Sequence, residues 1–402
     1  MTISLPNALP ITRPSGCPFD PPERLGQLRE SEPIARMRFA DDHLGWVVTG
    51  HALARQVLAD PRFSSRGELR HLPIDIQRFK GLRLPPVPRG MFIQMDAPEH
   101  SHYRKLLTGQ FTVRRMNQLV PRIEQIAEEH LEAMARKGPP AELVHDYALA
   151  IPSLVICELL GVPYAERGVF HERTKLMMNL ETGAEEAMAA FGEIMGYLSE
   201  LIDRKRTEPA DDLLSGLVTG GELDQEELVS FAVLLLTAGH ETTANMLALG
   251  AFALLRNPAQ LKALQAEPEL VDSAVEELLR YLTITHFGLQ RAALEDVEIG
   301  GVQVRKGEAL VLHTPTANRD PAKFEHPDEL DLHRHASGHL AFGHGVHQCL
   351  GQQLARVEMR IGFRKLFERF PTLRLAVPAE EVPMRTKMGI YGVHSLPVTW
   401  ES

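Results

Sequence analysis

Residues 342–351 read FGHGVHQCLG and place Cys349, one of only three cysteines in the chain, behind a turn that contains two glycines. Gly343 and Gly345 can adopt backbone conformations that are closed to other residues, so they let the chain pass close to a flat partner. The cysteine also lies near the start of a predicted helix at 350–369, and a helix N-terminus stabilises a thiolate. A thiolate held there can be a nucleophile or a metal ligand. An inert buried cysteine is the alternative, although it would not require the glycines.

Five histidines before this cysteine raise a second alternative, which is a structural zinc site. They are His333, His335, His339, His344 and His347. Only one thiol is nearby, however, and the spacings match neither a paired Cys-x-x-Cys motif nor a zinc finger. The sequence therefore disfavours zinc and leaves it open.

The composition describes a large, acidic, globular chain. Its 402 residues are 44% hydrophobic and carry a formal net charge of −10. No run of about 18 apolar residues is present to span a membrane, and the N-terminal residues lack the features of a secretory signal. Cys17, Cys157 and Cys349 are odd in number and far apart, which argues for a reducing compartment. Since acidic proteins disfavour nonspecific nucleic-acid binding, we expect a cytoplasmic protein that binds neither nucleic acid nor membrane.

Helical periodicity dominates the chain, and no internal repeat, low-complexity tract or flexible linker divides it. We expect one domain over residues 1–402, with an irregular, proline-rich N-terminal arm at 1–20. Asp224 is the predicted cap of a long helix, and Asn257-Pro258 is its predicted stop. The fold class is therefore mainly α with small β sheets. The predicted helices are 116–136, 224–255, 268–282 and 350–369, and the predicted strands are 45–49, 296–304, 309–313, 372–376 and 396–400.

The longest predicted helix contains a polar interruption in the middle of an apolar run, LLLTAGHETTAN at 234–245. Gly239 costs about 1 kcal/mol in a helix interior. A threonine hydroxyl there can bond to a carbonyl one turn earlier, which bends a helix. An exposed amphipathic face is the ordinary explanation for His240 and Glu241, but apolar residues flank the cluster on both sides. We therefore interpret the cluster as functional.

Two further sets of charged residues have ordinary surface explanations when each residue is taken singly. Glu277 and Arg280 share a helix face in EELLRY at 276–281, although exposed pairs of this kind contribute only about 0–1 kcal/mol. His100 and Arg104 are one helical turn apart in MDAPEHSHYRKLL at 95–107.

The residues Phe342, Gly343, Gly345, His347, Cys349 and Gly351 complete the pattern Phe-Gly-x-Gly-x-His-x-Cys-x-Gly. This pattern resembles the haem-binding loop of the cytochrome P450 family, and the other marks lie at the family's expected places along nearly the whole chain. By this resemblance, Cys349 is the axial thiolate ligand of the iron of haem b, and such a thiolate favours O–O cleavage. The implied fold is that of the family, a triangular prism of helices around a buried haem.

The resemblance also implies a role for each of the other marks. The segment at 234–245 is similar to the family's oxygen-activating motif, so Glu241 and Thr242 would be the catalytic acid–alcohol pair that delivers protons. The implied contacts to haem propionates are His100, Arg104, Arg291 and His347, and Phe342, Gly343 and Gly351 would lie around the ligand sulfur and porphyrin. Glu277, Arg280 and Arg334 would form a structural triad, for which Glu276 is the competing register.

Substrate contacts are expected in segments that vary among members of the family. The candidates are Met91, Phe92, Val233, Leu236, Ala238, Phe287 and Ile390, and a purely structural place in the core explains each of them equally well. An apolar pocket with a few polar contacts would suit a small lipophilic compound.

No flavin or nicotinamide fingerprint is present, so the chain needs an external reductant. Arg356, Arg360 and Arg364 recur every four residues and form a basic helical stripe, which is either solvated decoration or a docking face for an acidic ferredoxin. The expected partners are therefore a ferredoxin, a ferredoxin reductase, O2 and the substrate, and the protein itself is expected to be a monomer.

The sequence thus predicts a bacterial, actinobacterial-type P450 monooxygenase that hydroxylates or epoxidises a secondary metabolite or a xenobiotic. A peroxide-using or rearranging haem enzyme is one alternative, and the presence of Glu241 and Thr242 argues against it. A ligand sensor or a zinc-stabilised binding protein without catalysis is the other alternative, and it would hold no haem.

Overall fold

The computed structural model describes residues 8–76, 87–163 and 166–401, and the chain divides into two compact units. The first unit combines residues 1–84, 93–100 and 257–352, and the second combines residues 85–92, 101–256 and 353–402. Each unit is therefore assembled from segments that are far apart in the sequence, and the expectation of one domain stays a prediction. Residues 1–7 of the predicted N-terminal arm lie outside the described residues.

The first unit is built on a five-stranded sheet with the order β1-β2-β8-β5-β3. Its strands are β1 (Ile34–Arg38), β2 (Leu44–Val48), β3 (Phe63–Ser64), β5 (Leu289–Ala293) and β8 (Ala309–Leu312). β2 and β8 pair in parallel, and the other neighbours are antiparallel. A buried apolar cluster that includes Trp46, Val57 and Leu310 joins this sheet to α2 (His51–Ala59). The predicted strands at 45–49 and 309–313 are confirmed, and the structure shows that they are neighbours within the sheet.

The rest of the first unit consists of one hairpin and several helices. β6 (Val297–Ile299) and β7 (Val302–Val304) turn through Gly300 and Gly301, both at positive φ, so the single strand predicted at 296–304 is two strands. The helix predicted at 268–282 begins later, because Pro268–Leu270 forms a 3₁₀ turn before α12. The helices are α1 (Glu23–Ser31), α11 (Pro258–Ala266), α12 (Val271–Leu282) and α13 (Thr314–Ala317).

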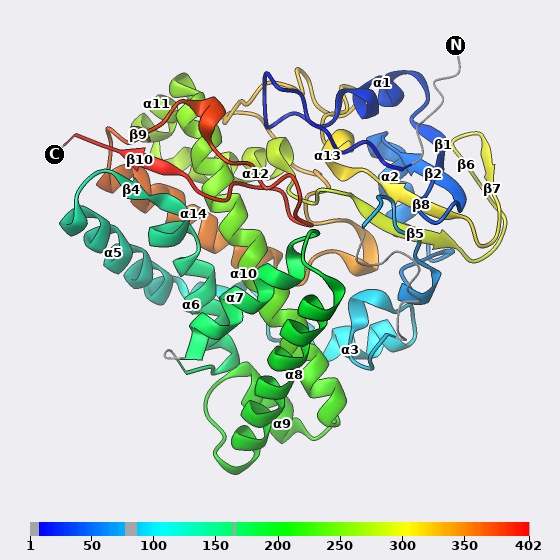
Figure 1. The fold of residues 1–402 in the computed structure, drawn as a ribbon, viewed down its shortest axis with the longest axis horizontal. Coiled ribbons are helices and arrows are strands. Elements are labelled where there is room, and N and C mark those ends of the chain that lie inside the picture. Colours follow the sequence, from blue (N-terminus) through cyan, green and yellow to red (C-terminus); the bar gives the residue numbers. More distant parts are fainter. Residues whose placement is uncertain (1–7, 77–86, 164–165, 402) are drawn as a thin grey trace. The chain divides into compact units, whose positions relative to one another are not determined.

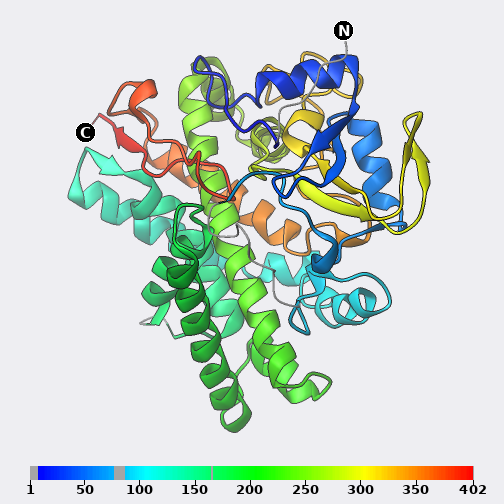
Figure 2. The ribbon, with the colours of Figure 1, turned by 45° about the vertical axis from the view of Figure 1, so that its right-hand side comes forward.

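The second unit is mainly helical and is organised around α10 (Gln225–Arg256), which lies against α6 (Ala150–Leu160) and α8 (Ala184–Thr207) (Figure 1). α8 and α10 run beside each other over much of their length (Figure 2). A small sheet in the order β4-β10-β9 pairs the end of the chain with residues near 141. Its strands are β4 (Ala141–Glu142), β9 (Arg374–Leu375) and β10 (Pro397–Thr399). The unit boundary falls within the first residues of two helices, α3 (Glu99–Thr108) and α14 (Gln352–Arg369), which belong to the second unit from residues 101 and 353 onward. Its other helices are α4 (Val113–Gln118), α5 (Val120–Lys137), α6, α7 (Arg167–Met178), α8, α9 (Leu213–Gly220) and α10.

The ends of α10 follow from its sequence. Asp224 Oδ1 accepts a hydrogen bond from the N–H of Glu227 at 3.0 Å, and Glu227 Oε2 accepts one from the N–H of Asp224 at 2.9 Å, which is a reciprocal capping box. The helix ends at Arg256 because Pro258 starts the next helix. Most of the helix is buried on every side, as its apolar composition predicts. The predicted cap and stop of this helix are both confirmed.

The helix predicted at 116–136 is wrong in one respect, because the chain forms α4 and α5 with a break at Leu119. Pro121 stands in the first turn of α5. Proline has no N–H and disfavours a helical residue before it, so it starts a new helix instead of continuing an old one. The predicted fold class, mainly α with small sheets, is confirmed. Within the described ranges, no helix is long and apolar enough to cross a membrane.

Candidate active site

Cys349 lies in a tight loop of the first unit. The loop passes through a 3₁₀ turn at Gly345–His347 and is closed by the N–H of Cys349, which donates to the Phe342 carbonyl at 2.9 Å. Cys349 is exposed, and α14 begins at Gln352, one turn further along the chain. The chain therefore presents a thiol immediately before a helix N-terminus, where a thiolate is stabilised.

The two glycines of this loop are required by different constraints. Both have a positive φ, 69° at Gly343 and 74° at Gly345. A Cβ at Gly345 would lie 2.4 Å from the carbonyl oxygen of Leu58 in α2, whereas a Cβ at Gly343 would meet Leu289 Cδ1 at an ordinary 3.5 Å. Gly345 thus lets the loop pass close to α2, a helix of the same chain. The sequence predicted that the glycines allow a close approach, but it did not identify α2 as the neighbour.

Cationic side chains gather in the first unit around Arg291 on β5. Arg291 is only 9% exposed, and burial together with the nearby charge of Arg70 lowers its pKa to about 10. Burial also lowers the pKa of Arg70, whose Nε has no hydrogen-bond partner within the described part of the chain. The acid near Arg291 is Asp96, and this carboxylate already accepts hydrogen bonds from the Ser64 hydroxyl and the Ser65 N–H.

The surroundings of these arginines fit a ligand with two carboxylates, such as the propionates of haem. Buried cations of like charge are costly unless anions compensate them. The ring of His100 is buried, and its centroid lies 4.0 Å from the ring centroid of His347. The first unit therefore brings together two predicted propionate contacts. Arg104 lies one helical turn after His100 on α3, in the second unit. Arg70 was not predicted, because its segment GELRHLP resembles no motif.

The predicted structural triad is brought together in the first unit. Glu277 and Arg280 are completely buried and joined by two hydrogen bonds, Nε to Oε2 at 2.7 Å and Nη2 to Oε1 at 2.8 Å. Arg334 Nε donates to Glu277 Oε1 at 3.1 Å. Glu276, the alternative to Glu277 as the acid of the triad, instead pairs with His339 at 3.1 Å. The triad thus ties α12 to the chain shortly before the cysteine loop.

Glu241 is buried in the middle of α10 and forms an ion pair within the second unit. Its Oε2 accepts a hydrogen bond from Arg385 Nη2 at 2.8 Å and another from Asn245 Nδ2 at 3.3 Å. The same Asn245 amide donates to the backbone carbonyl of Glu241 at 2.7 Å. Asn245 stands four residues after Glu241 on one helix face, which is a signal that sequence reasoning missed. Arg385 comes from the C-terminal segment and has no such local signal.

Thr242 has a different partner from Glu241. Its hydroxyl donates to the Ala238 carbonyl at 2.7 Å, one turn earlier, as predicted for a threonine in mid-helix. Thr242 is half-buried and Ala238 is exposed, whereas most of α10 is buried. A Cβ at Gly239 would lie 2.9 Å from Ile156 Cδ1, so this glycine lets α6 approach α10. The polar cluster therefore combines a packing role for glycine with an accessible hydroxyl.

A second buried carboxyl group lies beside this cluster. Glu358 on α14 is 1% exposed, and burial raises its pKa to about 8, while a hydrogen bond from Thr243 opposes that shift. Sequence reasoning did not single out this residue. The Glu358 side chain is therefore largely protonated at neutral pH.

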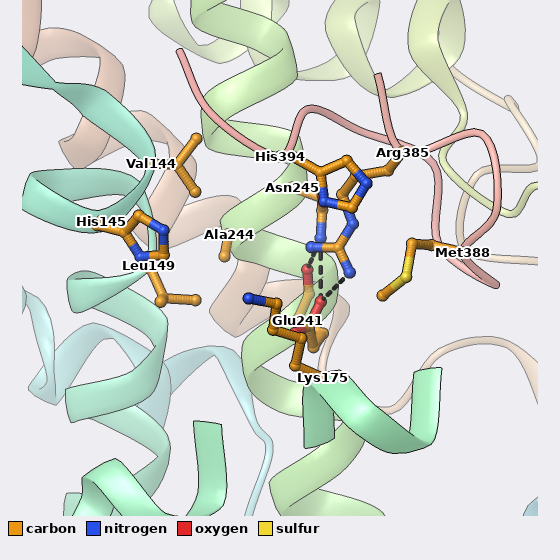
Figure 3. A pocket seen from close by; sticks show the side chains of 10 residues that line it. All are labelled: Val144, His145, Leu149, Lys175, Glu241, Ala244, Asn245, Arg385, Met388 and His394. Carbon is orange, nitrogen blue, oxygen red and sulfur yellow. Dashed lines mark hydrogen bonds and ion pairs between the residues drawn. The ribbon is translucent and has the colours of Figure 1, made fainter. Parts of the chain in front are cut away.

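A pocket of about 100 Å³ opens beside Glu241 in the second unit (Figure 3). Four elements contribute to its lining: α10, α7, a π-helical turn at Val144–Ala148, and the C-terminal segment before β10. Figure 3 shows the Glu241 carboxylate and the Arg385 guanidinium pointing toward each other at its wall. The lining residues are Val144, His145, Leu149, Lys175, Glu241, Ala244, Asn245, Arg385, Met388 and His394.

The predicted substrate contacts fall into two groups by burial. Val233, Leu236 and Phe92 are buried, and Phe92 packs edge-on against Phe231 with 5.7 Å between ring centroids. Met91, Phe287 and Ile390 are half-buried and Ala238 is exposed. The accessible group supports a role at a substrate surface better than the buried group does.

The basic stripe on α14 is partly neutralised. Arg364 pairs with Glu124 of α5 at 2.6 Å, and Arg356, Arg360 and Arg364 are all half-buried. The histidines before the cysteine loop are likewise dispersed, since His339 pairs with Glu276 and His333 with Glu267. Among the residues that the structure places, no three histidine, cysteine or acidic side chains come together as a metal site.

Comparisons with known proteins agree over almost the whole chain. A family model described as Cytochrome P450 matches residues 180–398. The chain is 51% identical to Cytochrome P450 105C1 from a Streptomyces species, over 95% of this chain and 96% of that one. It is 48% identical to pentalenic acid synthase of Streptomyces avermitilis, over 99% and 98% of the two chains. The crystal structure of CYP105P1 in complex with filipin I matches with a TM-score of 0.92 at 44% identity, over 98% of this chain and 99% of that one.

Proposed function

Because this chain belongs to the cytochrome P450 family and is a monooxygenase of that family, we propose that it inserts one oxygen atom of O2 into a C–H bond or a double bond of a small lipophilic compound. The proposal rests on the complete signature loop around Cys349, in which the thiol is exposed just before α14. Haem, which the family implies and whose b type we propose, supplies O2 binding and O–O cleavage when it is bound through this thiolate.

The protein's own part begins with holding the group. Cys349 would supply the thiolate ligand, with Phe342, Gly343, His347 and Gly351 in the same loop. The carboxylates of the group would be held by Arg291, His100, His347 and Arg104. We add Arg70, because it is half-buried, its charge lies near Arg291 and its Nε has no hydrogen-bond partner in the described ranges. The triad of Glu277, Arg280 and Arg334 keeps the preceding segment in place and does not touch reactants.

Proton delivery is the second part. The reaction consumes O2, two electrons and two protons for each substrate, and it yields the oxygenated product and one water. Glu241 is the acid that brings each proton. The Thr242 hydroxyl holds in place the water molecule that passes the proton on. The accessible hydroxyl of Thr242 and the buried carboxylate of Glu241 support these roles.

The substrate class and the electron donor complete the proposal. A lipophilic secondary metabolite or xenobiotic fits the apolar candidates Met91, Ala238, Phe287 and Ile390, and one relative is named a pentalenic acid synthase. Phe92, Val233 and Leu236 remain candidates from within the core. Electrons would come from a ferredoxin and a ferredoxin reductase. A cytoplasmic location and a monomeric state remain part of the proposal.

The test is the absorption difference spectrum of the dithionite-reduced protein with and without carbon monoxide. Wild-type protein is expected to give the red-shifted Soret band of thiolate-ligated haem, and Cys349→His is expected to lose this band while retaining haem. Cys17→Ala is the matched control, because Cys17 is a half-buried cysteine outside the signature loop. A wild-type protein purified with no haem band, or a band unaffected by Cys349→His, would contradict the proposal.

A further inference from the structure

The pocket beside Glu241 has a surplus of positive charge in its wall. Of the described residues that line it, Arg385 and Lys175 are cations and Glu241 is the acid. Arg385 Nη2 already donates to Glu241 Oε2 at 2.8 Å. Lys175, by contrast, forms no ion pair with any acid in the described part of the chain. Two cations against one carboxylate leave a surplus of one positive charge, which attracts a monovalent anion into the pocket.

The ring of His394 reports the same surplus. Burial lowers the pKa of His394, Arg385 and Lys175 lower it further, and Glu241 raises it by less than either cation lowers it. His394 therefore lies in a field that is net positive. Figure 3 shows the Lys175 amino group and the rings of His145 and His394 around the space beside Glu241. Each neutral imidazole can offer one N–H donor to an anion there.

Arg385 keeps donor capacity beyond its bond to Glu241. Its backbone N–H donates to the Gly392 carbonyl at 2.8 Å, which fixes the segment that carries it. A Cβ at Gly392 would lie 2.0 Å from Asn245 Oδ1, so this segment sits directly on α10. Arg385 is nine-tenths buried, and its Nε has no hydrogen-bond partner in the described ranges. Because a guanidinium has several N–H donors, a second anion can bind beside Glu241.

One carboxylate holds the backbone of both segments that carry the histidines. Glu142 Oε2 accepts a hydrogen bond from the N–H of His145 at 2.8 Å. Glu142 Oε1 accepts one at 2.6 Å from the N–H of Leu396, which stands two residues after His394. His145 belongs to the π-helical turn at Val144–Ala148, and such turns are frequent at functional sites. The walls of the pocket are therefore in place before a ligand binds, which lowers the entropic cost of binding.

The remaining part of the lining is apolar. It consists of Val144, Leu149, Ala244 and Met388. The volume of about 100 Å³ admits only a handful of water-sized groups, which is close to the number of heavy atoms in a short carboxylate. A monatomic anion would compensate the charge but leave the apolar side in contact with water. The charge, the volume and the apolar side together select a small anion with a short alkyl chain.

We propose that this pocket binds a small aliphatic monocarboxylate, with its carboxylate between Lys175 and Arg385 and its alkyl chain against Leu149 and Met388. A carboxylate accepts charge-assisted hydrogen bonds from an ammonium and a guanidinium, and the planar fork of arginine matches its geometry. The alkyl chain adds affinity through burial of apolar surface. This binding is separate from the proposed oxygenation and needs no electron donor.

Calorimetric titration of the haem-loaded protein with sodium butyrate tests the proposal, with sodium chloride added to keep the ionic strength constant. Butyrate should bind saturably at a single site. Acetate should bind about tenfold more weakly, since each CH2 group lost from the pocket weakens binding by about fourfold. Butylammonium has the same chain with the opposite charge and should not bind.

Variants of the pocket should change the affinity for butyrate in opposite directions. Lys175→Met should weaken binding by about tenfold or more, because it removes the cation that forms no ion pair. Lys175→Arg keeps the charge and should bind within about threefold of wild type. Glu241→Gln should tighten binding by about tenfold, because the surplus of charge rises and Arg385 is released to the ligand.

Lys387→Met is the matched control. Lys387 lies two residues after Arg385 and outside the lining of the pocket, and its ion pair with Glu181 is exposed. This variant should bind butyrate as wild type does. Lys175 is itself exposed, so its variants test the proposal even if Glu241→Gln does not fold.

Four outcomes would overturn the inference. They are the absence of saturable butyrate binding to wild type, equal affinity in Lys175→Met and Lys387→Met, equal binding of butyrate and butylammonium, and weaker binding in a folded Glu241→Gln variant. A purely structural role of Lys175 and Glu241 would weaken binding in both variants, so tighter binding in Glu241→Gln would support the site. Because the measurement is of binding, a failure of the proposed oxygenation would leave this test intact.

Discussion

Two buried glutamates, Glu241 and Glu358, lie in the second unit in surroundings of different charge. Glu241 faces a guanidinium 2.8 Å away, so its charge is compensated. Glu358 contacts the Thr243 hydroxyl, and burial raises its pKa to about 8. The two carboxyl groups therefore differ in their partners, an arginine at Glu241 and a threonine hydroxyl at Glu358.

The raised pKa of Glu358 predicts that stability falls with rising pH. The unfolded chain releases this proton near the ordinary value of 4.5, whereas the folded chain keeps it up to about 8. The contribution is therefore complete below about pH 4.5 and is lost between there and about pH 8. Glu358→Gln should raise the free energy of unfolding at pH 7 by on the order of 3 kcal/mol relative to wild type.

Urea titrations of the variant at pH 5 and pH 8 measure this effect. The gain from Glu358→Gln should be much larger at pH 8 than at pH 5. Glu368→Gln, an exposed change on the same helix, is the control and should give the same small effect at both values. Equal gains at the two pH values for Glu358→Gln would show that the acid is not buried in its neutral form.

Thr242→Ala should uncouple the reaction. Without the hydroxyl, the water that passes each proton on is no longer held in place, so oxygen consumption should persist while product falls by about tenfold or more and hydrogen peroxide rises. Thr237→Ala is a close control, because Thr237 makes the same kind of bond to the Val233 carbonyl at 2.8 Å one turn earlier on α10. If the two variants are equally coupled, the Thr242 hydroxyl is only part of the helix bend.

At the scale of elements, the sequence predicted those features that depend on residues close together in the chain. α10 could be predicted with its ends, because Asp224, Glu227 and Pro258 act within a few residues of the helix. β1 and β5 were missed, because a strand is defined by a partner, and β5 pairs with β8 and β3 from distant parts of the chain. The break at Pro121 was missed because apolar periodicity continues across it.

The same division applies to the candidate site. Cys349, Glu241 and Thr242 stand in contiguous motifs, so the sequence alone singled them out. The partner of Glu241 could not be predicted, since Arg385 is 144 residues away and stands in an irregular segment. Arg70 was missed for the same reason, because its importance comes from its place near Arg291 in the fold and not from any pattern around it.

Within the cysteine loop, Gly345 is expected to tolerate substitution far less than Gly343. Gly345→Ala adds a Cβ 2.4 Å from a backbone oxygen of α2 and also strains a positive φ, whereas Gly343→Ala strains φ alone. The second change should cost about 1–2 kcal/mol, and the first should displace the loop from α2. Haem content per protein, measured after purification, should therefore fall sharply for Gly345→Ala and little for Gly343→Ala. Equal haem content in both variants would mean that the loop does not depend on contact with α2.

At the scale of the whole molecule, the net charge of −10 opposes an acidic partner. An acidic ferredoxin must therefore be attracted by a local basic surface. The basic stripe of Arg356, Arg360 and Arg364 on α14 is the candidate, because these residues recur every four positions along the helix. Docking of this kind is governed by charges at close range, since salt screens exposed charges beyond about 8 Å at physiological ionic strength.

Arg356→Glu should slow reduction by ferredoxin, and the slowing should be greater at low salt than at high salt. Stopped-flow reduction at two ionic strengths measures this difference. Lys262→Glu makes the same change of charge on α11, in the other unit, and serves as the control. A salt dependence that is equal for wild type and Arg356→Glu would place the docking surface elsewhere.

The C-terminal segment that carries Arg385 also has a consequence for how the protein is made. Glu241 is translated well before Arg385, and α10 is therefore synthesised with a carboxylate whose cation is still missing. β10 likewise pairs with β4 only after Pro397–Thr399 has been synthesised. The second unit thus cannot complete its fold before these residues emerge, although domains usually begin to fold as they leave the ribosome. Chains truncated before Arg385 should therefore be cleared by proteases.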